Sequence, residues 1–369
     1  MDQQALNGSG AHEEDERLGP VLVIGTGLIG ASVGLALSGQ GVQVHLRDLD
    51  PANAMVAAGL GAGVLEPPTS CRLVIVATPP GTVSQTVRHA LAEFPEAVVT
   101  DTASVKEAVI EDLLAQPGGC GPELARYVGS HPMAGTQYTG PLTAAGELFV
   151  DRTWVLTPRP DNDPEAVERV ERMVRVCGAR PVVLDAAEHD AAVAEVSHLP
   201  HLMSVLTGAS LRRSTPTHLR LAGTGVRDVT RVARSQTAMW REILVANRQA
   251  VRTRLEAIRD DLDVLLASLD DPEELESFLA VGQEGARSVA GKHGRVMGET
   301  VAVVVEIPDA PGALARLFSD MEGVGVNIED LSVEHDPSRE VGFLAIDVDP
   351  ARAEELKGWM RERGWGLRS

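Results

Sequence analysis

The chain has 369 residues and a formal net charge of -20, from 33 Lys and Arg against 53 Asp and Glu. This length is too great for one compact core and predicts two or three domains. The acidity argues against nucleic acid as a partner, because binding to a phosphate backbone needs a surplus of cations. If the substrate is a small anion, the few cations must gather in one place.

The sequence predicts a cytoplasmic protein with no membrane partner. Residues 1–18 are polar and acidic without the apolar core of a signal peptide, so we expect a disordered leader. No run approaches the roughly 18 apolar residues that span a bilayer. Cys71, Cys120 and Cys177 lie far apart without metal-ligand spacing, so neither a disulfide framework nor a metal site is expected.

Residues 19–185 alternate short apolar runs with amphipathic helical stretches. The expected strands are Val21–Ile24, Val42–Leu46, Leu73–Ala77, Ala97–Thr100, Tyr127–Gly129, Thr153–Leu156 and Pro181–Leu184. The expected helices between them are Leu28–Ser38, Ala52–Ala58, Thr82–Phe94 and Ser104–Gln116. Several strands are apolar on both faces, which is typical of a parallel sheet covered by helices on each side. The pattern predicts a doubly wound α/β domain of the Rossmann type.

The rest of the chain predicts two further domains. Residues 186–291 have a helical pattern over Val193–Leu211, Asp228–Leu255 and Leu262–Leu269, with a break at Gly223–Gly225. Such a block often supplies a substrate pocket and a homodimer interface, although that is an association. Residues 299–369, after a linker at Lys292–Arg295, have the order β-α-β-β-α-β of a ferredoxin-like α+β domain. Its expected elements are Thr300–Ile307, Gly312–Glu322, Val326–Val333, Gly342–Val348, Ala351–Arg363 and a strand after Trp365.

The first predicted strand runs into a turn of the form G-x-G-x-x-G, and a helical pattern follows at once. Its residues are Gly25, Thr26, Gly27, Leu28, Ile29 and Gly30. The first glycine permits the tight bend, the second lets the backbone approach a pyrophosphate, and the third packs helix on strand. The turn predicts dinucleotide binding, the alternative being a glycine-rich turn without a ligand.

Polar side chains at the ends of the next strands are candidates for contact with the cofactor. Asp48 follows the second strand, where a carboxylate accepts from a ribose 2′-OH and repels a 2′-phosphate, favouring NAD over NADP. The neighbouring Arg47 weakens that preference. Thr78 and Asp101 end the third and fourth strands, and Ser104 follows closely. Thr78 and Ser104 are equally suited to cap the helices after them.

A second group of motifs carries a family resemblance. The segment Gly129–Gly135, G-S-H-P-M-A-G, resembles the H-P-M-A-G signature of the prephenate/arogenate dehydrogenases of tyrosine biosynthesis. Further matches are Gly25–Ser32 (G-T-G-L-I-G-A-S), Asp101–Lys106 (D-T-A-S-V-K), Ser197–His201 (S-H-L-P-H) and Arg227–Arg231 (R-D-V-T-R), with Trp240 beyond. The resemblance covers residues 20–290 in the expected order. The last segment, with I-P-D-A-P-G-A-L at Ile307–Leu314, resembles an ACT regulatory domain.

The resemblance implies an NAD-dependent enzyme that oxidatively decarboxylates prephenate to 4-hydroxyphenylpyruvate. A hydride leaves the carbinol carbon, the hydroxyl loses its proton and the carboxylate departs as CO2, so aromatisation drives the reaction. His131, at the family's catalytic position, is implied as acceptor for the hydroxyl, which suits an imidazole pKa of about 6.5. Ser104 would bind the same hydroxyl or orient the imidazole. Taken alone, His131 is equally a histidine that caps a loop beside Pro132.

The helical block carries the implied substrate-binding residues. Ser197 and His201 stand at i and i+4 and share one helical face, which Pro200 should open by a kink. His198 could face elsewhere. The resemblance places Ser197 and His201 in the substrate pocket, whereas His201 alone would more often be a packed core histidine.

Two arginines and one glutamine bear on the substrate side chain. A guanidinium matches a carboxylate, and the resemblance implies that Arg231 binds the side-chain carboxylate, while Arg227 stays open. The alternative is a solvated helix face on which Asp228 is the ion-pair partner. Gln137 stands where some relatives have Glu, and this neutral amide leaves both prephenate and its amino analogue arogenate open as substrates.

In the ACT-like segment a turn opens a helix. The candidate effector-binding residues are Asp309, Ala310, Pro311, Gly312 and Asn327. Backbone donors there are expected to receive an amino-acid carboxylate, which would give feedback by tyrosine. The alternative is a domain that only pairs with its copy in a dimer.

Three other functions fit parts of the sequence. Arogenate dehydrogenase is the nearest. A β-hydroxyacid dehydrogenase would need a lysine-bearing helix signature, which the middle block does not have. A catalytically silent sensor of NAD and an amino acid would not need Ser104, His131 and Arg231 together.

Overall fold

The computed structural model describes residues 18–115, 121–135, 138–289, 301–308, 310–326, 328, 330–336 and 341–368. The chain forms two compact units, Met1–Arg259 and Asp260–Ser369. The first unit contains both the predicted α/β part and most of the predicted helical part, whose separation near residue 185 stays a prediction. The predicted leader lies outside the described residues except for Leu18, which is buried in the core.

The first unit is built on a seven-stranded sheet of order β2-β1-β3-β4-β5-β6-β7. The strands are β1 (Val21–Ile24), β2 (Val44–Arg47), β3 (Leu73–Val76), β4 (Val98–Asp101), β5 (Tyr127–Pro132), β6 (Thr153–Thr157) and β7 (Arg180–Val183). Strands β1 to β5 are parallel, but β6 is antiparallel to β5, and β7 is parallel to β6. The purely parallel sheet expected from the sequence is therefore wrong at β6. In its described residues, the β5–β6 connection has only the short turn η3 (Pro141–Thr143) and no crossover helix.

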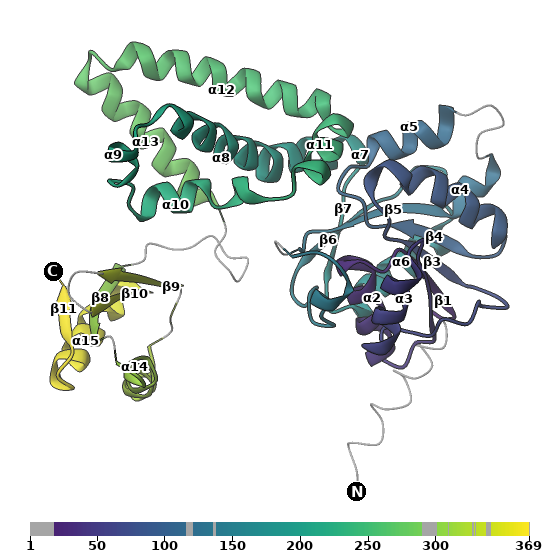
Figure 1. The fold of residues 1–369 in the computed structure, drawn as a ribbon, viewed down its shortest axis with the longest axis horizontal. Helices are drawn as coiled ribbons and strands as arrows, with labels where there is room; N and C mark the ends of the chain where they lie inside the picture. The colour runs from purple at the N-terminus through teal and green to yellow at the C-terminus, as the bar shows by residue number, and fades with distance from the viewer. Residues whose placement is uncertain are drawn as a thin grey trace, which may run out of the picture. The chain divides into compact units, whose positions relative to one another are not determined.

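Helices cover both faces of this sheet (Figure 1). They are α2 (Leu28–Gly39), α3 (Pro51–Gly59) and α6 (Pro164–Val176) on one face, and α4 (Val83–Glu93) and α5 (Glu107–Ala115) on the other. Successive residues of one strand point to opposite cores, so Ile75 packs with Leu37 while Val76 packs with Leu91. Two-sided burial, worth about 1.5–3 kcal/mol per large aliphatic side chain, explains the uninterrupted apolar runs.

A helical segment completes the first unit. It comprises α7 (Ala186–Val193), a π-helical turn (Ala194–His198), α8 (Leu199–Ser210), α9 (Pro216–Leu219), α10 (Thr224–Thr230), α11 (Thr237–Ala246) and α12 (Arg248–Ser268), which crosses the unit boundary. The single helix expected over Asp228–Leu255 is wrong, because the extended Ser235 and the cap residue Asn247 interrupt it. The predicted break is confirmed at Gly223, which is the extended N-cap of α10, whereas Gly225 lies inside that helix.

The second unit contains α13 (Pro272–Ser288) and a four-stranded antiparallel sheet of order β11-β8-β10-β9. Its elements are β8 (Val301–Pro308), α14 (Ala313–Glu322), β9 (Asp330–Asp336), β10 (Val341–Val348), α15 (Pro350–Glu362) and β11 (Gly366–Arg368). The predicted ferredoxin-like order is confirmed, although β9 begins four residues later than expected, after a turn at Gly325 with φ +62°. Of the candidate effector residues, Asp309 and Asn327 lie outside the described residues.

Membrane-spanning helices and metal clusters are not found in the described part of the chain. No helix there is long and apolar enough to cross a bilayer. Within the same residues, no three His, Cys, Asp or Glu side chains are grouped so that they could hold a metal ion.

Candidate active site

The glycine-rich turn after β1 is closed toward the protein and open at its second glycine. Gly25 has φ +94°, and a Cβ there would lie 2.5 Å from the carbonyl oxygen of Ala77. A Cβ on Gly30 would come within 1.9 Å of the carbonyl oxygen of Gly25, whereas one on Gly27 would meet nothing within 4 Å. Leu28 and Ile29 then begin α2. The turn thus offers an open helix N-terminus at the β1/β3 position where this strand order changes direction.

Asp48 and Thr78 flank this turn. One Asp48 oxygen accepts from the Thr26 amide at 2.6 Å and the Thr26 hydroxyl at 2.8 Å, and the other accepts from the Asp50 amide at 2.9 Å. The Thr78 hydroxyl oxygen is buried and has no hydrogen-bond partner among the described residues. A carboxylate held at the end of β2 and an orphaned hydroxyl beside the turn both fit a bound dinucleotide.

In the sequence, the cation of Arg47 beside Asp48 weakens the expected preference for NAD over NADP, but in the structure Arg47 is paired with another residue. Its guanidinium donates to both carboxylate oxygens of Glu93, the last residue of α4, at 2.7 and 2.8 Å. The hydrogen bonds to Glu93 raise the pKa of Arg47, and the same bonds lower that of Glu93. The cation next to Asp48 is therefore neutralised by an ion pair.

The expectation that the Asp101 side chain contacts the cofactor is corrected. Asp101 is fully buried, and its carboxylate accepts from Lys106 and, at 2.7 Å each, from the Tyr127 hydroxyl and the Ala103 amide. Lys106, also buried, donates to the Ser130 carbonyl at 2.7 Å. Burial lowers the pKa of the Lys106 ammonium below its usual value, although Asp101 opposes that shift. Asp101 and Lys106 thus hold the main chain next to His131.

His131 ends a chain of hydrogen-bonded polar side chains. Its Nδ1 lies 2.9 Å from Nε2 of His189, whose Nδ1 lies 2.7 Å from a carboxylate oxygen of Asp190. The same carboxylate accepts from the main-chain amides of Lys106 at 2.8 Å and Glu107 at 2.9 Å, at the start of α5. We call His131, His189 and Asp190 the relay.

The relay fixes the tautomers of both histidines. The Asp190 carboxylate can only accept, so Nδ1 of His189 carries a proton and Nε2 of neutral His189 accepts. His131 therefore donates from Nδ1 and keeps a lone pair on Nε2. The pKa of His131 lies well below its usual value, because of desolvation first and then the neighbouring His189, Lys106 and His198. A neutral imidazole with a free Nε2 is able to accept a proton.

Two further histidines pack on Trp240 of α11. The ring of His201 stacks on the indole at a centroid distance of 3.6 Å, and His198 meets it edge-on at 6.0 Å. That His198 faces elsewhere than His201 stays a prediction, because Nδ1 of His198 lies 3.2 Å from Nδ2 of Asn247. The π-helical turn that ends at His198 precedes Pro200. Nδ1 of His201 is buried without a partner among the described residues, which suits a ligand-binding role.

Arg231 stands close to the face that carries His201. Ala233, two residues further on, donates its amide to the Ser204 hydroxyl at 3.0 Å, and Ser204 follows His201 by three residues on α8. The side chains of Arg227 and Arg231 are exposed, and neither forms an ion pair with Asp228 or another described residue. A cation without an ion-pair partner in the described part of the chain is able to bind an anionic ligand.

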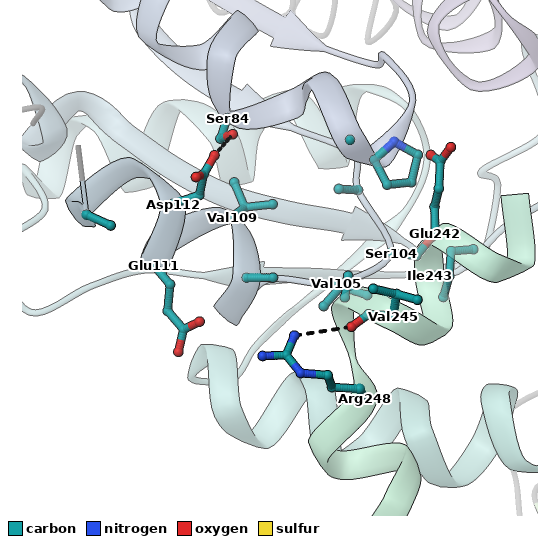
Figure 2. Close-up of a pocket in the computed structure, with 16 residues that line it drawn as sticks. Ser84, Ser104, Val105, Val109, Glu111, Asp112, Glu242, Ile243, Val245 and Arg248 are labelled. Carbon is teal, nitrogen blue, oxygen red and sulfur yellow. Dashed lines mark hydrogen bonds between the residues drawn. The ribbon is translucent and has the colours of Figure 1, made fainter.

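The remaining candidate residues, Ser104, Ser197 and Gln137, lie in different surroundings. Ser104 borders a pocket of about 560 Å³ between the start of α5 and α11, to which Val105, Glu242 and Arg248 also contribute (Figure 2). Within the described part of the chain the Ser104 hydroxyl has no hydrogen-bond partner, and His189 orients His131 in its place. Ser197 is half-buried in the π-helical turn. Gln137 lies outside the described residues.

Comparisons with known proteins agree with this arrangement. The family model described as prephenate dehydrogenase, nucleotide-binding domain, matches residues 33–183, and the model for the dimerization domain of prephenate dehydrogenase matches residues 185–281. A probable prephenate dehydrogenase of Streptomyces niveus is 35% identical over 362 residues, covering 94% of this chain and 99% of the relative. The chain belongs to the prephenate dehydrogenase family.

Solved structures of prephenate dehydrogenases and their relatives have the same fold. The A. aeolicus prephenate dehydrogenase, solved with hydroxyphenyl propionate and NAD+, is 28% identical with a TM-score of 0.66, covering 72% of this chain and 96% of that chain. The Synechocystis arogenate dehydrogenase is 26% identical with a TM-score of 0.61, covering 73% and 99%. These matches confirm the predicted family and the Rossmann-type fold with its helical block.

Three residues that contact the site or its supports, His189, Asp190 and Asn247, were not predicted from the sequence. His189 and Asp190 lie on α7, and His189 stands four residues before the buried Val193, hence on the same helical face. A histidine and a carboxylate at buried helix positions are a signal that could have been used, because buried polar groups need partners. Their partners themselves could not be found from spacing.

Proposed function

We propose that this protein is an NAD-dependent prephenate dehydrogenase that converts prephenate to 4-hydroxyphenylpyruvate. The observation that supports this most is the relay, which leaves Nε2 of His131 free to accept a proton. His131 lies near the carboxyl end of β5, and the glycine-rich turn follows the carboxyl end of β1 in the same sheet. Membership of the prephenate dehydrogenase family gives the reaction class. Arogenate is the alternative substrate.

The residues around the turn fit NAD. Gly27 gives space for a pyrophosphate, α2 directs its N-terminus there, and Asp48 would accept from a ribose hydroxyl. With Arg47 paired to Glu93, the carboxylate of Asp48 disfavours a 2′-phosphate, which supports NAD over NADP. When bound, NAD+ would accept the hydride that leaves the carbinol carbon.

His131 and Arg231 would act on the substrate itself. His131 Nε2 accepts the hydroxyl proton, and the resulting positive charge is shared with His189 and balanced by the Asp190 carboxylate. Arg231, with His201 beside it, would bind the side-chain carboxylate, while Ser197 and Ser104 would offer hydroxyl groups to the substrate. The departing carboxylate leaves its bonding electrons to the ring, so aromatisation needs no further acid or base before CO2 leaves.

A rate assay decides the proposed function. Prephenate and arogenate are offered separately, each with NAD+ or NADP+, and reduced cofactor is followed at 340 nm. We expect the highest kcat/KM with prephenate and NAD+. A higher kcat/KM with arogenate would make arogenate the substrate. No turnover with either compound would refute the enzymatic function and favour a catalytically silent sensor.

Replacing Arg231 with leucine is expected to raise KM for prephenate by about 10- to 100-fold, because a charge-assisted bond to a carboxylate contributes about 1.5–3 kcal/mol. The value of kcat should change little, since the bond forms equally in ground and transition states. Arg220→Leu, an exposed arginine in the same block, is the control. Arg227→Leu shows whether Arg227 also binds substrate. An unchanged KM in Arg231→Leu would leave Arg231 on a solvated face.

For the second unit we propose an ACT-type regulatory domain whose ligand is tyrosine. The ferredoxin-like order supports this, as does the turn before α14, where Gly312 has φ +84° and follows Ala310 and Pro311. Addition of tyrosine to the assay should lower the rate or raise KM, and no change in either would leave a structural role. The match to a dimerization domain supports a homodimer, and the cytoplasmic location stays a prediction.

A further inference from the structure

Asn247 connects the helical segment to the relay. It is the residue between α11 and α12, and it is 4% exposed. Its side-chain Nδ2 donates to the main-chain carbonyl of Asp190 at 2.8 Å and lies 3.2 Å from Nδ1 of His198. One amide group thus bridges α7, the π-helical turn and α11.

These contacts settle the hydrogen positions. The carbonyl of Asp190 can only accept, so the Asn247 atom facing it is the nitrogen. The second hydrogen of that nitrogen points to Nδ1 of His198, which must accept it. His198 is therefore neutral and carries its own proton on Nε2. Burial, the largest effect on this imidazole, lowers its pKa to about 4, so this state persists through neutral pH.

The bond to Asp190 complements those that hold its carboxylate. Lys106 and Glu107 fix the carboxylate from the start of α5, and Asn247 fixes the carbonyl of the same residue from the junction of α11 and α12. His189 is the adjacent residue, and both its ring nitrogens are used in the relay. A displacement of about 1 Å in such a chain is able to cost about 10²-fold in rate.

We propose that Asn247 is a positioning residue of the reaction: it holds Asp190, and through it His189 and the free Nε2 of His131, in the geometry for proton acceptance. It touches neither substrate nor cofactor in this assignment. The inference rests on the proposed function for its kinetic consequence, but the hydrogen-bond pattern on which it depends can be measured without turnover.

The test uses Asn247→Asp and Asn247→Leu in the full chain. Aspartate has nearly the same shape but no amide hydrogen, and leucine removes both bonds. We expect kcat for prephenate to fall by about 10- to 100-fold, the range found when a hydrogen-bond partner that orients a metal-binding side chain is removed. KM for prephenate and the dissociation constant of NAD+, measured by fluorescence titration, should stay within about threefold, because binding groups are not removed.

Asn162→Asp is the matched control. Asn162 also donates its Nδ2 to main-chain carbonyls, those of Tyr127, Leu124 and Ala125 at 2.8, 3.1 and 3.2 Å, but has no contact with the relay. The same chemical change there is expected to lower thermal stability and leave kcat within about threefold. A fall in kcat equal to that of Asn247→Asp would reduce Asn247 to a general structural role and overturn the proposal.

Imidazole ¹⁵N NMR reports the pattern directly and does not require turnover. In the wild type, His198 should show a bare Nδ1 and a protonated Nε2 at neutral pH. In Asn247→Asp, the new carboxylate should draw a proton onto Nδ1 of His198. A wild-type spectrum with the proton on Nδ1 would refute the proposal whatever the variants do. If the wild type showed the expected tautomer but no turnover, the proposed function alone would fail.

Discussion

Replacing His131 with asparagine is expected to lower kcat for prephenate by about 10²- to 10⁴-fold, which is the usual range for loss of a positioned general base. Asparagine has a nitrogen that still reaches His189, but no atom with a proton affinity like that of Nε2. KM and the affinity for NAD+ should change by less than about threefold, because Arg231 and the glycine-rich turn are intact. Steady-state kinetics followed at 340 nm measure kcat and KM separately.

The control for this variant is His89→Asn, an exposed histidine on α4 that should keep full activity. The pH profile gives a second check. His131 must be neutral to accept a proton, and its pKa is lowered well below its usual value. As pH falls through about 6.5, kcat/KM of the free enzyme should therefore be maintained, and it should decline only at lower pH. A wild-type kcat in His131→Asn, or an acid limb above pH 6.5, would contradict the assignment.

Much of the fold follows from local patterns. β1 lies where the sequence places it, and β3 and β4 are within one residue of prediction, because strands buried on two faces must be continuously apolar. Element type is less certain where burial is partial. The long helix expected over Asp228–Leu255 is interrupted at Asn247, whose side chain is used in tertiary bonds that no helical periodicity shows.

The residues of the candidate site also differ in whether a local sequence pattern identifies them. The glycine turn, Asp48 and His131 are recognisable because each stands at a fixed distance from a strand end. His189 could not be paired with His131 from sequence, since 58 residues separate them and the bond exists only once α7 packs beside α5. The pairing of Asp101 was missed for a different reason: Lys106, which uses its carboxylate, is only five residues away, but no local pattern shows that both side chains are fully buried.

Replacing Asp190 with asparagine is expected to lower kcat by about 10²- to 10⁴-fold, because it changes the tautomer of the relay. An asparagine amide is able to donate to Nδ1 of His189, which then carries its proton on Nε2. His131 must in turn accept at Nδ1 and hold its proton on Nε2, where the substrate hydroxyl would bind. A catalytic histidine held in the wrong tautomer loses up to about 10⁴-fold in kcat while its geometry stays intact.

The same substitution has a cost in stability that must be separated from the kinetic effect. Asp190 accepts two amides at the start of α5, and one amide facing an asparagine nitrogen would be left unpaired, at about 1–3 kcal/mol. Asp163→Asn is the control, because the Asp163 carboxylate also accepts a main-chain amide at a helix N-terminus, that of Glu165 in α6, and asparagine caps about as well. Kinetics are therefore measured well below each variant's Tm. The relay predicts a loss of kcat without a matching rise in KM for Asp190→Asn, and neither effect for Asp163→Asn. If Asp190→Asn instead kept kcat within about threefold of wild type, Asp190 would be only a helix cap, and His189 would orient His131 without help from a fixed negative charge.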